Sequence, residues 1–420
     1  MDIVSHLFRT EFSKLVSVLT KSFGIEHIEV AEDIAGETFL TALQTWPYKG
    51  VPANPTAWLY AVAKNKTKNH LTRDSVFRTK VLENFSADRR NNEINIDLSE
   101  GNITDSQLQM LFTLCHPSIS TEAQICLALR ILCGLGLNEI ADAFLTNKGT
   151  IHKRLQRAKE KLYTKEIKIE VPTGTEIKHR LDTVLHTIYL LFSEGYYSES
   201  NKAVIREELC IEALNLGFLL LQNPLTDNHE TNSLMSLMCF QSSRLKARKS
   251  ETGSMILYDE QDTGLWDTEF IEKGFYYLQQ ASKRDIRSKY YIEASIAYWY
   301  TVDNNNPDKW VSILKLYDAI KSIDNSSIVS LNRMWAYAKV YGSSAAIREA
   351  EKLALTDNHF YFILLAELYK AVDLRKAREN YEKAFHLCKT DKEKESIQKR
   401  IDEIKNRAVM VKSIGDRKAY

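Results

Sequence analysis

The sequence contains none of the segments that would place the chain in a membrane or in an oxidising compartment. No apolar run approaches the roughly 20 residues that a membrane-spanning helix needs. The first residues are interrupted by Asp2, His6, Arg9 and Glu11, unlike the apolar core of a secretory signal. The six cysteines form no CxxC pair and no disulfide-like framework. We therefore expect a cytoplasmic protein that does not enter a membrane.

Patterns typical of enzymes are also missing. The sequence has no P-loop, GxSxG, HExxH or dinucleotide-binding fingerprint. Cys115, His116, Cys126 and Cys133 are residue types that bind zinc. Their helical spacing and apolar neighbours favour buried thiols instead. We predict no catalytic residue, no metal site and no cofactor.

Charge is uneven along a chain whose formal net charge is only +1. Residues 64–80 carry six basic side chains against Asp74 alone, and residues 147–168 are also basic. Acidic residues gather elsewhere, notably at 259–262. Two local basic patches in a nearly neutral chain indicate a DNA contact rather than general adhesiveness.

Helical periodicity dominates the chain, and strand-like alternation is scarce, so we predict an all-α fold. Residues 5–23 and 29–45 read as amphipathic helices, after which Pro47, Pro52 and Pro55 should break the chain. A new helix is expected from Thr56 to about Arg73, with Pro55 at its start. Residues 85–104 are polar, lack a sustained apolar face and indicate a linker.

A short apolar-spaced helix, a polar turn and a basic helix follow one another in residues 137–162. The turn is Thr146-Asn147-Lys148-Gly149, and the second helix carries five basic residues against Glu160. This outline is typical of a helix-turn-helix whose second helix enters a DNA groove. A basic helix face exposed to solvent is the alternative for the second helix taken alone.

After a junction at 165–175, the rest of the chain reads as a long helical array. Residues 360–388 place small or aromatic residues at tetratricopeptide-like spacing in two helices joined near Asp373. Ala336–Leu353 is the best earlier copy. The acidic cluster at 259–262 has three interpretations: a metal site, a mimic of DNA phosphates, or a capped structural loop, which we favour.

Two groups of motifs together resemble the extracytoplasmic-function (ECF) class of the sigma-70 family, the promoter-specificity subunits of bacterial RNA polymerase. Region 2 of that family is matched by Glu32-Asp33-Ile34, Glu37-Thr38-Phe39, Pro55-x-Ala57-Trp58-Leu59, Ala63-x-Asn65 and Arg73. Region 4 is matched by Gly149-Thr150-Ile151 and Arg154-Leu155-x-Arg157-Ala158. Later motifs are similar to a subgroup with a large C-terminal tetratricopeptide-like extension: Leu114-Cys115-His116-Pro117, Phe192-Ser193-Glu194-Gly195-Tyr196, Asp259-Glu260-Gln261-Asp262 and Leu331-Asn332-Arg333.

In the first motif group, the resemblance implies contacts with polymerase and with the −10 promoter element. The acidic side of the helix near Glu29 would bind the polymerase through Glu32, Asp33 and Glu37, while Ile34, Phe39 and Leu43 turn inward. A solvated face is the alternative for these acids. The polar stripe Asn65, Lys66, Asn69 and Arg73 would recognise the −10 element and capture an unstacked base. Trp46 and Tyr48 are candidates for base stacking or for core packing, and Trp58 is expected in the core.

In the second group, residues early in the basic helix would read bases of the −35 element, and later ones would contact phosphates. We assign Thr150, Lys153 and Arg154 to base reading. Arg157 and Lys161 are assigned to backbone anchoring. The apolar residues Ile151, Leu155 and Ala158 should lie beneath them.

Together these expectations divide the chain into region 2 (1–80), a linker (81–104), region 4 (105–165) and a regulatory extension (176–420). The expected partners are promoter DNA and core RNA polymerase, through its β′ clamp and β subunits. A protein or ligand partner of the extension is left open. The alternative function is a helix-turn-helix transcriptional regulator that binds duplex DNA without a sigma role.

Overall fold

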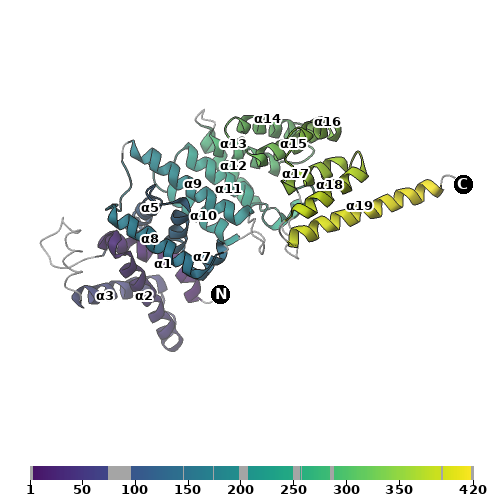
Figure 1. The fold of residues 1–420 in the computed structure, drawn as a ribbon. Coiled ribbons are helices and arrows are strands. Elements are labelled where there is room, and N and C mark those ends of the chain that lie inside the picture. Colours follow the sequence, from purple (N-terminus) through teal and green to yellow (C-terminus); the bar gives the residue numbers. More distant parts are fainter. Residues whose placement is uncertain are drawn as a thin grey trace. The chain divides into compact units, whose positions relative to one another are not determined.

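In the computed structural model, every regular element among the described residues is a helix (Figure 1). The structure describes residues 3–73, 96–144, 146–173, 175–197, 207–248, 256, 258–283, 288–388 and 391–417. No strand occurs in these ranges, which confirms the all-α prediction. None of their helices has the length and apolar character required to cross a membrane.

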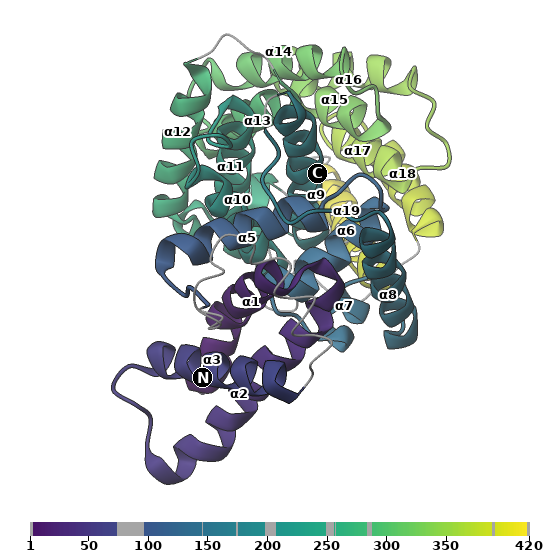
Figure 2. The ribbon, with the colours of Figure 1, turned by 90° about the vertical axis from the view of Figure 1, so that its left-hand side faces the viewer.

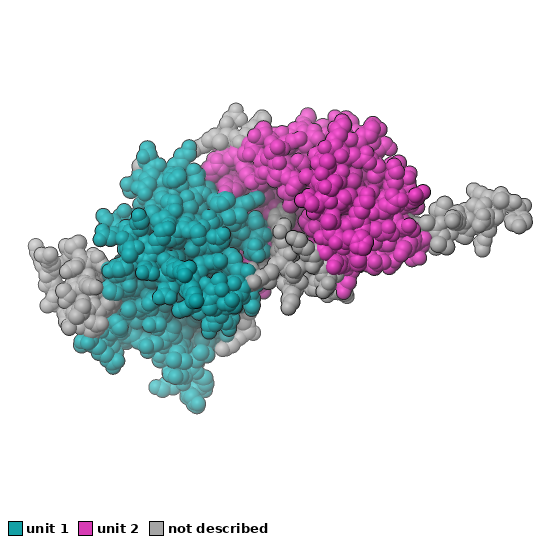
Figure 3. Space-filling model, viewed as in Figure 1, with its two compact units in different colours: residues 1–194, 211–227 teal, residues 195–210, 228–420 magenta. Residues whose placement is uncertain are grey.

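The chain forms two compact units, shown in different colours in Figure 3. Unit 1 contains residues 1–194 and 211–227, and unit 2 contains residues 195–210 and 228–420. Each unit has an apolar core of its own, because buried aliphatic and aromatic side chains occur throughout both. The predicted sigma segments therefore share unit 1 with part of the predicted extension.

Unit 1 begins with the three helices of the predicted region 2: α1 (Ile3–Phe23), α2 (Ile28–Lys49) and α3 (Pro55–Arg73). An apolar residue at every third or fourth position of α2 explains its packing against α1. Ile34 and Phe39 are 4% and 3% exposed, whereas Leu43 is 50% exposed. The prediction that Leu43 turns inward is therefore wrong.

The end of α2 also differs from the sequence prediction, because the helix continues through Pro47 to Lys49. Proline cannot donate a backbone hydrogen bond, but this loss is small in the exposed last turn of a helix. The helix ends at Gly50, whose φ of 82° suits glycine. The Gly50 N–H donates to the Trp46 carbonyl at 2.9 Å.

The start of α3 matches the prediction. The Asn54 side-chain oxygen accepts a hydrogen bond from the backbone N–H of Ala57 at 3.0 Å. Pro55 follows as the first helical residue, where its missing N–H has no partner to lose. The capping amide and the proline together fix this helix start locally.

The next helices of unit 1 are α5 (Glu100–Leu114), α6 (Thr121–Leu127), α7 (Leu137–Ala143) and α8 (Lys148–Thr164). Helix α5 begins at Glu100, within the predicted linker, because Ile103 and Ser106 are buried there. It lies beside α1 (Figure 2): Lys21 of α1 donates to the Asn102 side-chain oxygen at 3.1 Å, and Gln107 of α5 donates to the Ser13 hydroxyl of α1 at 3.3 Å. A π-helical turn, Ala128–Leu132, follows α6 directly.

Helix α9 (Glu176–Tyr197), predicted as the start of the extension, packs against the helices of the predicted region 4. Arg180 donates to the Phe112 carbonyl at 2.7 Å, and both groups are buried. Thr187 donates to the Gln124 side-chain oxygen at 2.9 Å, also in the interior. These contacts explain why residues 176–194 belong to unit 1. The following helix is α10 (Glu207–Leu221).

Unit 2 contains a succession of helices: α11 (His229–Ser242), α12 (Thr268–Ser282), α13 (Lys289–Thr301), α14 (Lys309–Lys321), α15 (Ser327–Tyr341), α16 (Ser343–Glu351), α17 (His359–Tyr369), α18 (Leu374–Leu387) and α19 (Asp391–Arg417). Single-turn helices cover Lys246–Arg248, Tyr258–Glu260 and Thr263–Leu265. The predicted helix pair at 360–388 is α17 and α18, and Asp373 caps α18 by accepting from Arg375 and Lys376.

Neighbouring helices of unit 2 share their buried faces. Val329 and Ala336 of α15 pack into one apolar cluster with α13 and α14. Leu331 and Met334 of the same helix pack into a second cluster with α16 to α19. A helix that contributes to two adjacent cores joins successive helix pairs into an array, as the sequence predicts.

All six cysteines are buried free thiols, which confirms the burial predicted for Cys115, Cys126 and Cys133 from their apolar neighbours. Cys115 is fully buried between the predicted region 4 and α9, and burial raises the pKa of its thiol to about 12, above its ordinary value of 9.0.

The raised thiol pKa predicts that stability falls at alkaline pH. The folded chain keeps the Cys115 proton above pH 9, where the unfolded chain loses it. We expect this thiol to lower the unfolding free energy by about 1.4 kcal/mol per pH unit above that point. Urea unfolding of the wild type and Cys115→Ala at pH 8 and pH 10 measures it. The stability gap between the two proteins should narrow at pH 10, and an equal gap at both values would contradict the expectation.

Candidate nucleic-acid interface

Helices α7 and α8 form the predicted helix-turn-helix. The side-chain oxygen of Asn147 caps α8 by accepting from the Thr150 backbone N–H at 2.9 Å. Ile151, Leu155 and Ala158 form the buried side of α8 and are at most 5% exposed. Because these apolar residues lie on one side of α8, the opposite side of the helix faces solvent.

The residues assigned to the −35 element lie mostly on that solvent side. Thr150, Lys153, Arg157 and Lys161 are exposed. Arg154 is half-buried: its guanidinium lies 5.7 Å from the centroid of the Phe144 ring, and its Nη1 is 3.7 Å from the Cys126 Sγ. Contacts with Phe144, the residue directly after α7, and with Cys126 of α6 thus orient the Arg154 side chain before any DNA is bound, which lowers the entropy lost on binding.

The polar stripe of α3 is also directed to solvent. Asn65, Asn69 and Arg73 are exposed. Lys66 is half-buried and forms an ion pair with Glu37 of α2, with an Nζ to Oε2 distance of 3.0 Å. Amide and cationic groups three or four residues apart on one helix can contact successive nucleotides of a single strand.

The two aromatic residues at the end of α2 have different environments. Trp46 is 5% exposed and meets the Trp58 ring edge-on at a centroid distance of 5.4 Å. Trp46 is therefore a core residue. Tyr48 is 89% exposed, so its ring is available for stacking on a base.

The acidic face of α2 is divided between solvent and protein. Asp33 and Glu37 are exposed, but Glu32 is only 9% exposed. Its two carboxylate oxygens accept from Arg130 Nε at 2.8 Å and from Lys159 Nζ at 2.6 Å. Lys159 also lies 3.6 Å from a carboxylate oxygen of Glu29. One of the three residues assigned to polymerase binding is thus covered by the predicted region 4.

The sequence patterns assign neither Arg130 nor Lys159 to a site. Arg130 lies in the π-helical turn after α6 and also donates to the Leu135 carbonyl at 3.2 Å, while Lys159 lies on α8. They are separated from Glu32 by 98 and 127 residues. A weak signal was present, because Lys159 falls on the apolar side of α8, between Leu155 and Leu162, where a cation requires a partner.

The acidic cluster of unit 2 is a structural loop, as favoured from the sequence. Asp259 pairs with Lys339 of α15 at 2.7 Å, and Glu260 pairs with Arg400 of α19 at 3.2 Å. Asp262 caps the following turn by accepting from the Gly264 N–H at 2.8 Å. Each carboxylate of this loop therefore has a partner within unit 2.

Comparison with known proteins assigns two segments of the chain. Residues 7–76 match the family described as Sigma-70 region 2, and residues 180–282 match a family of unknown function, DUF6596. The first segment contains the acidic face of α2 and the polar stripe of α3. The second runs from α9 to the end of α12.

Two curated proteins are similar to the chain. The uncharacterized protein R00370 of Rhizobium meliloti is 30% identical over 404 residues, which covers 93% of this chain and 95% of that protein. The ECF RNA polymerase sigma-E factor of Haemophilus influenzae is 28% identical over 161 residues, covering 36% of this chain and 82% of that protein. No solved structure matches the chain.

Proposed function

Because the chain belongs to the same family as the R00370 protein and is a sigma factor of the sigma-70 family, we propose that it binds core RNA polymerase and directs promoter recognition. Region 2 would contact the polymerase β′ clamp through Asp33, Glu37 and Glu32, and the −10 element through the stripe Asn65, Lys66, Asn69 and Arg73. Helix α8 would read the −35 element through Thr150, Lys153 and Arg154, with Arg157 and Lys161 on phosphates.

The observation that carries the proposal is the match of residues 7–76 to Sigma-70 region 2. That segment contains both an acidic surface for a protein partner and a polar stripe for a nucleic-acid strand, on adjacent helices. The match to an ECF sigma factor supports the same assignment. The role is non-catalytic: polymerase performs the chemistry, and this chain supplies promoter specificity from the cytoplasm.

The alternative is a transcriptional regulator that uses only the helix-turn-helix on duplex DNA. The exposed basic face of α8 is compatible with that function. The regulator function, however, gives no role to the segment that matches Sigma-70 region 2. Promoter binding measured with and without core polymerase separates the two. We expect specific binding only with core polymerase. Equal specific binding by the free chain would favour the regulator.

We further propose that the extension is a tetratricopeptide-like array that controls the sigma domains. The helix pairs of unit 2 and the cores shared by adjacent pairs support this assignment. A truncation that tests control should end after Asp227, because α9 and residues 211–227 belong to unit 1. Removing α9 would expose the buried Phe112 carbonyl that Arg180 satisfies.

Run-off transcription by the full chain and by residues 1–227 gives the direction of control. Higher activity of the truncated protein would identify the extension as an inhibitor, whereas loss of activity would make it a required part. Unchanged activity would contradict a regulatory role. Urea unfolding of the truncated protein provides the control that unit 1 still folds.

A further inference from the structure

Region 2 and region 4 are held together by ion pairs to one buried carboxylate, that of Glu32. Glu32 of α2 receives hydrogen bonds from Arg130 and Lys159, both contributed by the region 4 segment. The two cations come from separate elements, the π-helical turn and α8. Since Glu32 is 9% exposed, a protein surface that requires this carboxylate cannot reach it in this arrangement.

The same contact limits the distance between the two DNA-reading surfaces. Helix rises and side-chain lengths along the path from Lys66 through Glu37, Glu32 and Lys159 to Thr150 bound their separation at about 50 Å. The −10 and −35 elements are roughly 25 base pairs apart, as their names state, which is about 85 Å of straight duplex. The fastened arrangement therefore cannot engage both elements at once.

We propose that Glu32, Arg130 and Lys159 form an intramolecular latch that holds the sigma domains closed, and that polymerase competes with region 4 for the Glu32 face of α2. The proposal rests on the proposed sigma function. Opening exposes the third acidic residue of the polymerase surface and frees region 4 to move along the promoter. The same three charged residues would therefore control polymerase binding and the distance over which regions 2 and 4 can contact promoter DNA.

The latch can be weakened from its cationic side without changing a residue assigned to polymerase binding or to DNA reading. Lys159→Gln or Arg130→Gln leaves Glu32 buried with one charged partner fewer, and a buried carboxylate tolerates such a loss poorly. The open state, in which water solvates Glu32, gains population as a result. Direct mutation of Glu32 is less informative, because it alters the latch and the polymerase surface together.

The test compares wild type, Lys159→Gln and Arg130→Gln as full chains in binding to core polymerase. We expect each variant to bind at least tenfold more tightly. Lys165→Gln is the matched control: it removes the same charge from an exposed side chain just beyond α8 and should leave the affinity unchanged.

A distance measurement reports opening directly. Spin labels are placed on cysteines introduced at the exposed Gln44 of α2 and Gln156 of α8, and opening lengthens the distance between them. The native thiols are all buried.

Three outcomes would overturn the latch. The first is a spin-label distance that is unchanged in both Lys159→Gln and Arg130→Gln. The second is a longer distance without tighter binding to core polymerase. The third is an increase in polymerase affinity in Lys165→Gln equal to that in Lys159→Gln. Failure of the proposed function gives a different result, since then neither wild type nor variants bind core polymerase, even where the labels move apart.

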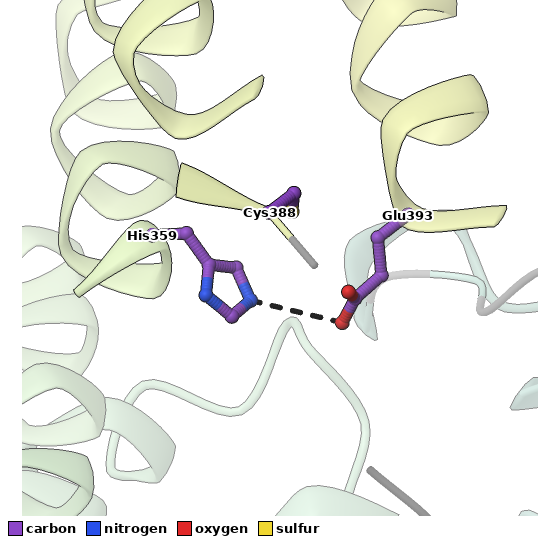
Figure 4. A group of neighbouring side chains, drawn as sticks. All are labelled: His359, Cys388 and Glu393. Carbon is purple, nitrogen blue, oxygen red and sulfur yellow. Dashed lines mark ion pairs between the residues drawn. The ribbon is translucent and has the colours of Figure 1, made fainter. Parts of the chain in front are cut away.

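An independent cluster in unit 2 has the composition of a metal site. His359 lies at the start of α17, Cys388 at the end of α18 and Glu393 in the first turn of α19. Their ligand atoms all lie within 4.8 Å of one another. Figure 4 shows the imidazole of His359 and the carboxylate of Glu393 directed toward each other, and His359 Nε2 is 3.7 Å from Glu393 Oε1.

The cluster is suited to a divalent cation in two further respects. His359 Nε2 is buried and has no hydrogen-bond partner among the described residues, so this nitrogen is available to coordinate a metal ion. The nitrogen-to-oxygen spacing across a tetrahedral zinc ion is about 3.4 Å, close to the observed distance. Thiolate, imidazole and carboxylate together favour Zn²⁺ over Mg²⁺ or Ca²⁺.

From this geometry we infer a second site: His359, Cys388 and Glu393 bind a zinc-like ion, which leaves one of four coordination positions for water. The ion would join the ends of three helices in the last part of the array. Binding would therefore stabilise unit 2 and make the packing of α19 dependent on the metal supply.

Cobalt substitution tests this inference on the full chain. Co²⁺ should produce a thiolate-to-metal charge-transfer absorption that Cys388→Ser abolishes, and added Zn²⁺ should displace it. Since a substitution of buried Cys388 can disturb folding, the half-buried Glu393→Gln and His359→Gln serve as second variants, each expected to weaken Zn²⁺ binding at least tenfold. His386→Gln, an exposed histidine of α18, is the matched control and should bind normally. No charge-transfer band in the wild type, or full affinity in His359→Gln, would overturn the site.

Discussion

Replacing Arg154 with alanine is expected to lower transcription from the cognate promoter about 5- to 150-fold. An arginine that contacts a base edge contributes about 1–3 kcal/mol to promoter binding. The structure adds a reason for an effect near the upper end. Phe144 and Cys126 already hold the guanidinium in place, so little side-chain entropy is lost when DNA binds. Run-off transcription on the cognate promoter and on variants of its upstream element measures the loss.

The pattern of the loss is as informative as its size. If Arg154 reads a base, the variant should lose its preference at one position of the upstream element. An equal loss on every sequence would reassign Arg154 to a phosphate contact. Cys126→Ala is the control for the intramolecular contact alone, because it removes the sulfur near Arg154 and leaves the guanidinium free to meet DNA.

Removing both exposed amides of α3 should have a comparable or larger effect on promoter opening. For Asn65→Ala together with Asn69→Ala we expect a reduction of about 100-fold, since two base or sugar contacts of 1–3 kcal/mol each are lost. The structure indicates little cost to folding, because both side chains are exposed. Permanganate reactivity of unpaired thymines near the −10 element measures opening directly.

A promoter with a pre-melted −10 region provides the second arm of that experiment. Such a template removes the cost of unpairing but still requires capture of the single strand, so the double variant should recover only part of its activity. Thr72→Ala, which alters another exposed polar residue of α3, is the control and should open the promoter normally. Wild-type opening by the double variant would exclude the stripe from −10 recognition.

Features encoded by neighbouring residues could be predicted from the sequence. The start of α3 follows from Asn54 and Pro55, and the start of α8 follows from Asn147, because a cap and its helix lie within a few residues. Periodicity correctly placed Ile151, Leu155 and Ala158 inside. These elements depend on interactions between residues close together in the sequence, so the sequence pattern alone is enough to predict them.

The features that were missed depend on distant partners. The burial of Glu32 requires cations that lie 98 and 127 residues further along the chain, and nothing near Glu32 indicates them. Helix α9 reads as part of the extension until the Arg180 and Thr187 contacts show which core it completes. Local propensity was also misleading at Pro47, where an exposed last helical turn tolerates the missing donor.

The central claim, that this chain confers promoter specificity on RNA polymerase, is tested most directly by transcription with purified bacterial core polymerase on a genome-wide pool of promoter fragments. The account predicts transcripts that start at a small set of promoters sharing −10 and −35 sequences, and that require both the chain and core polymerase. Transcription no higher than that of core polymerase alone, across the whole pool and also with the latch-weakened Lys159→Gln variant, would contradict it.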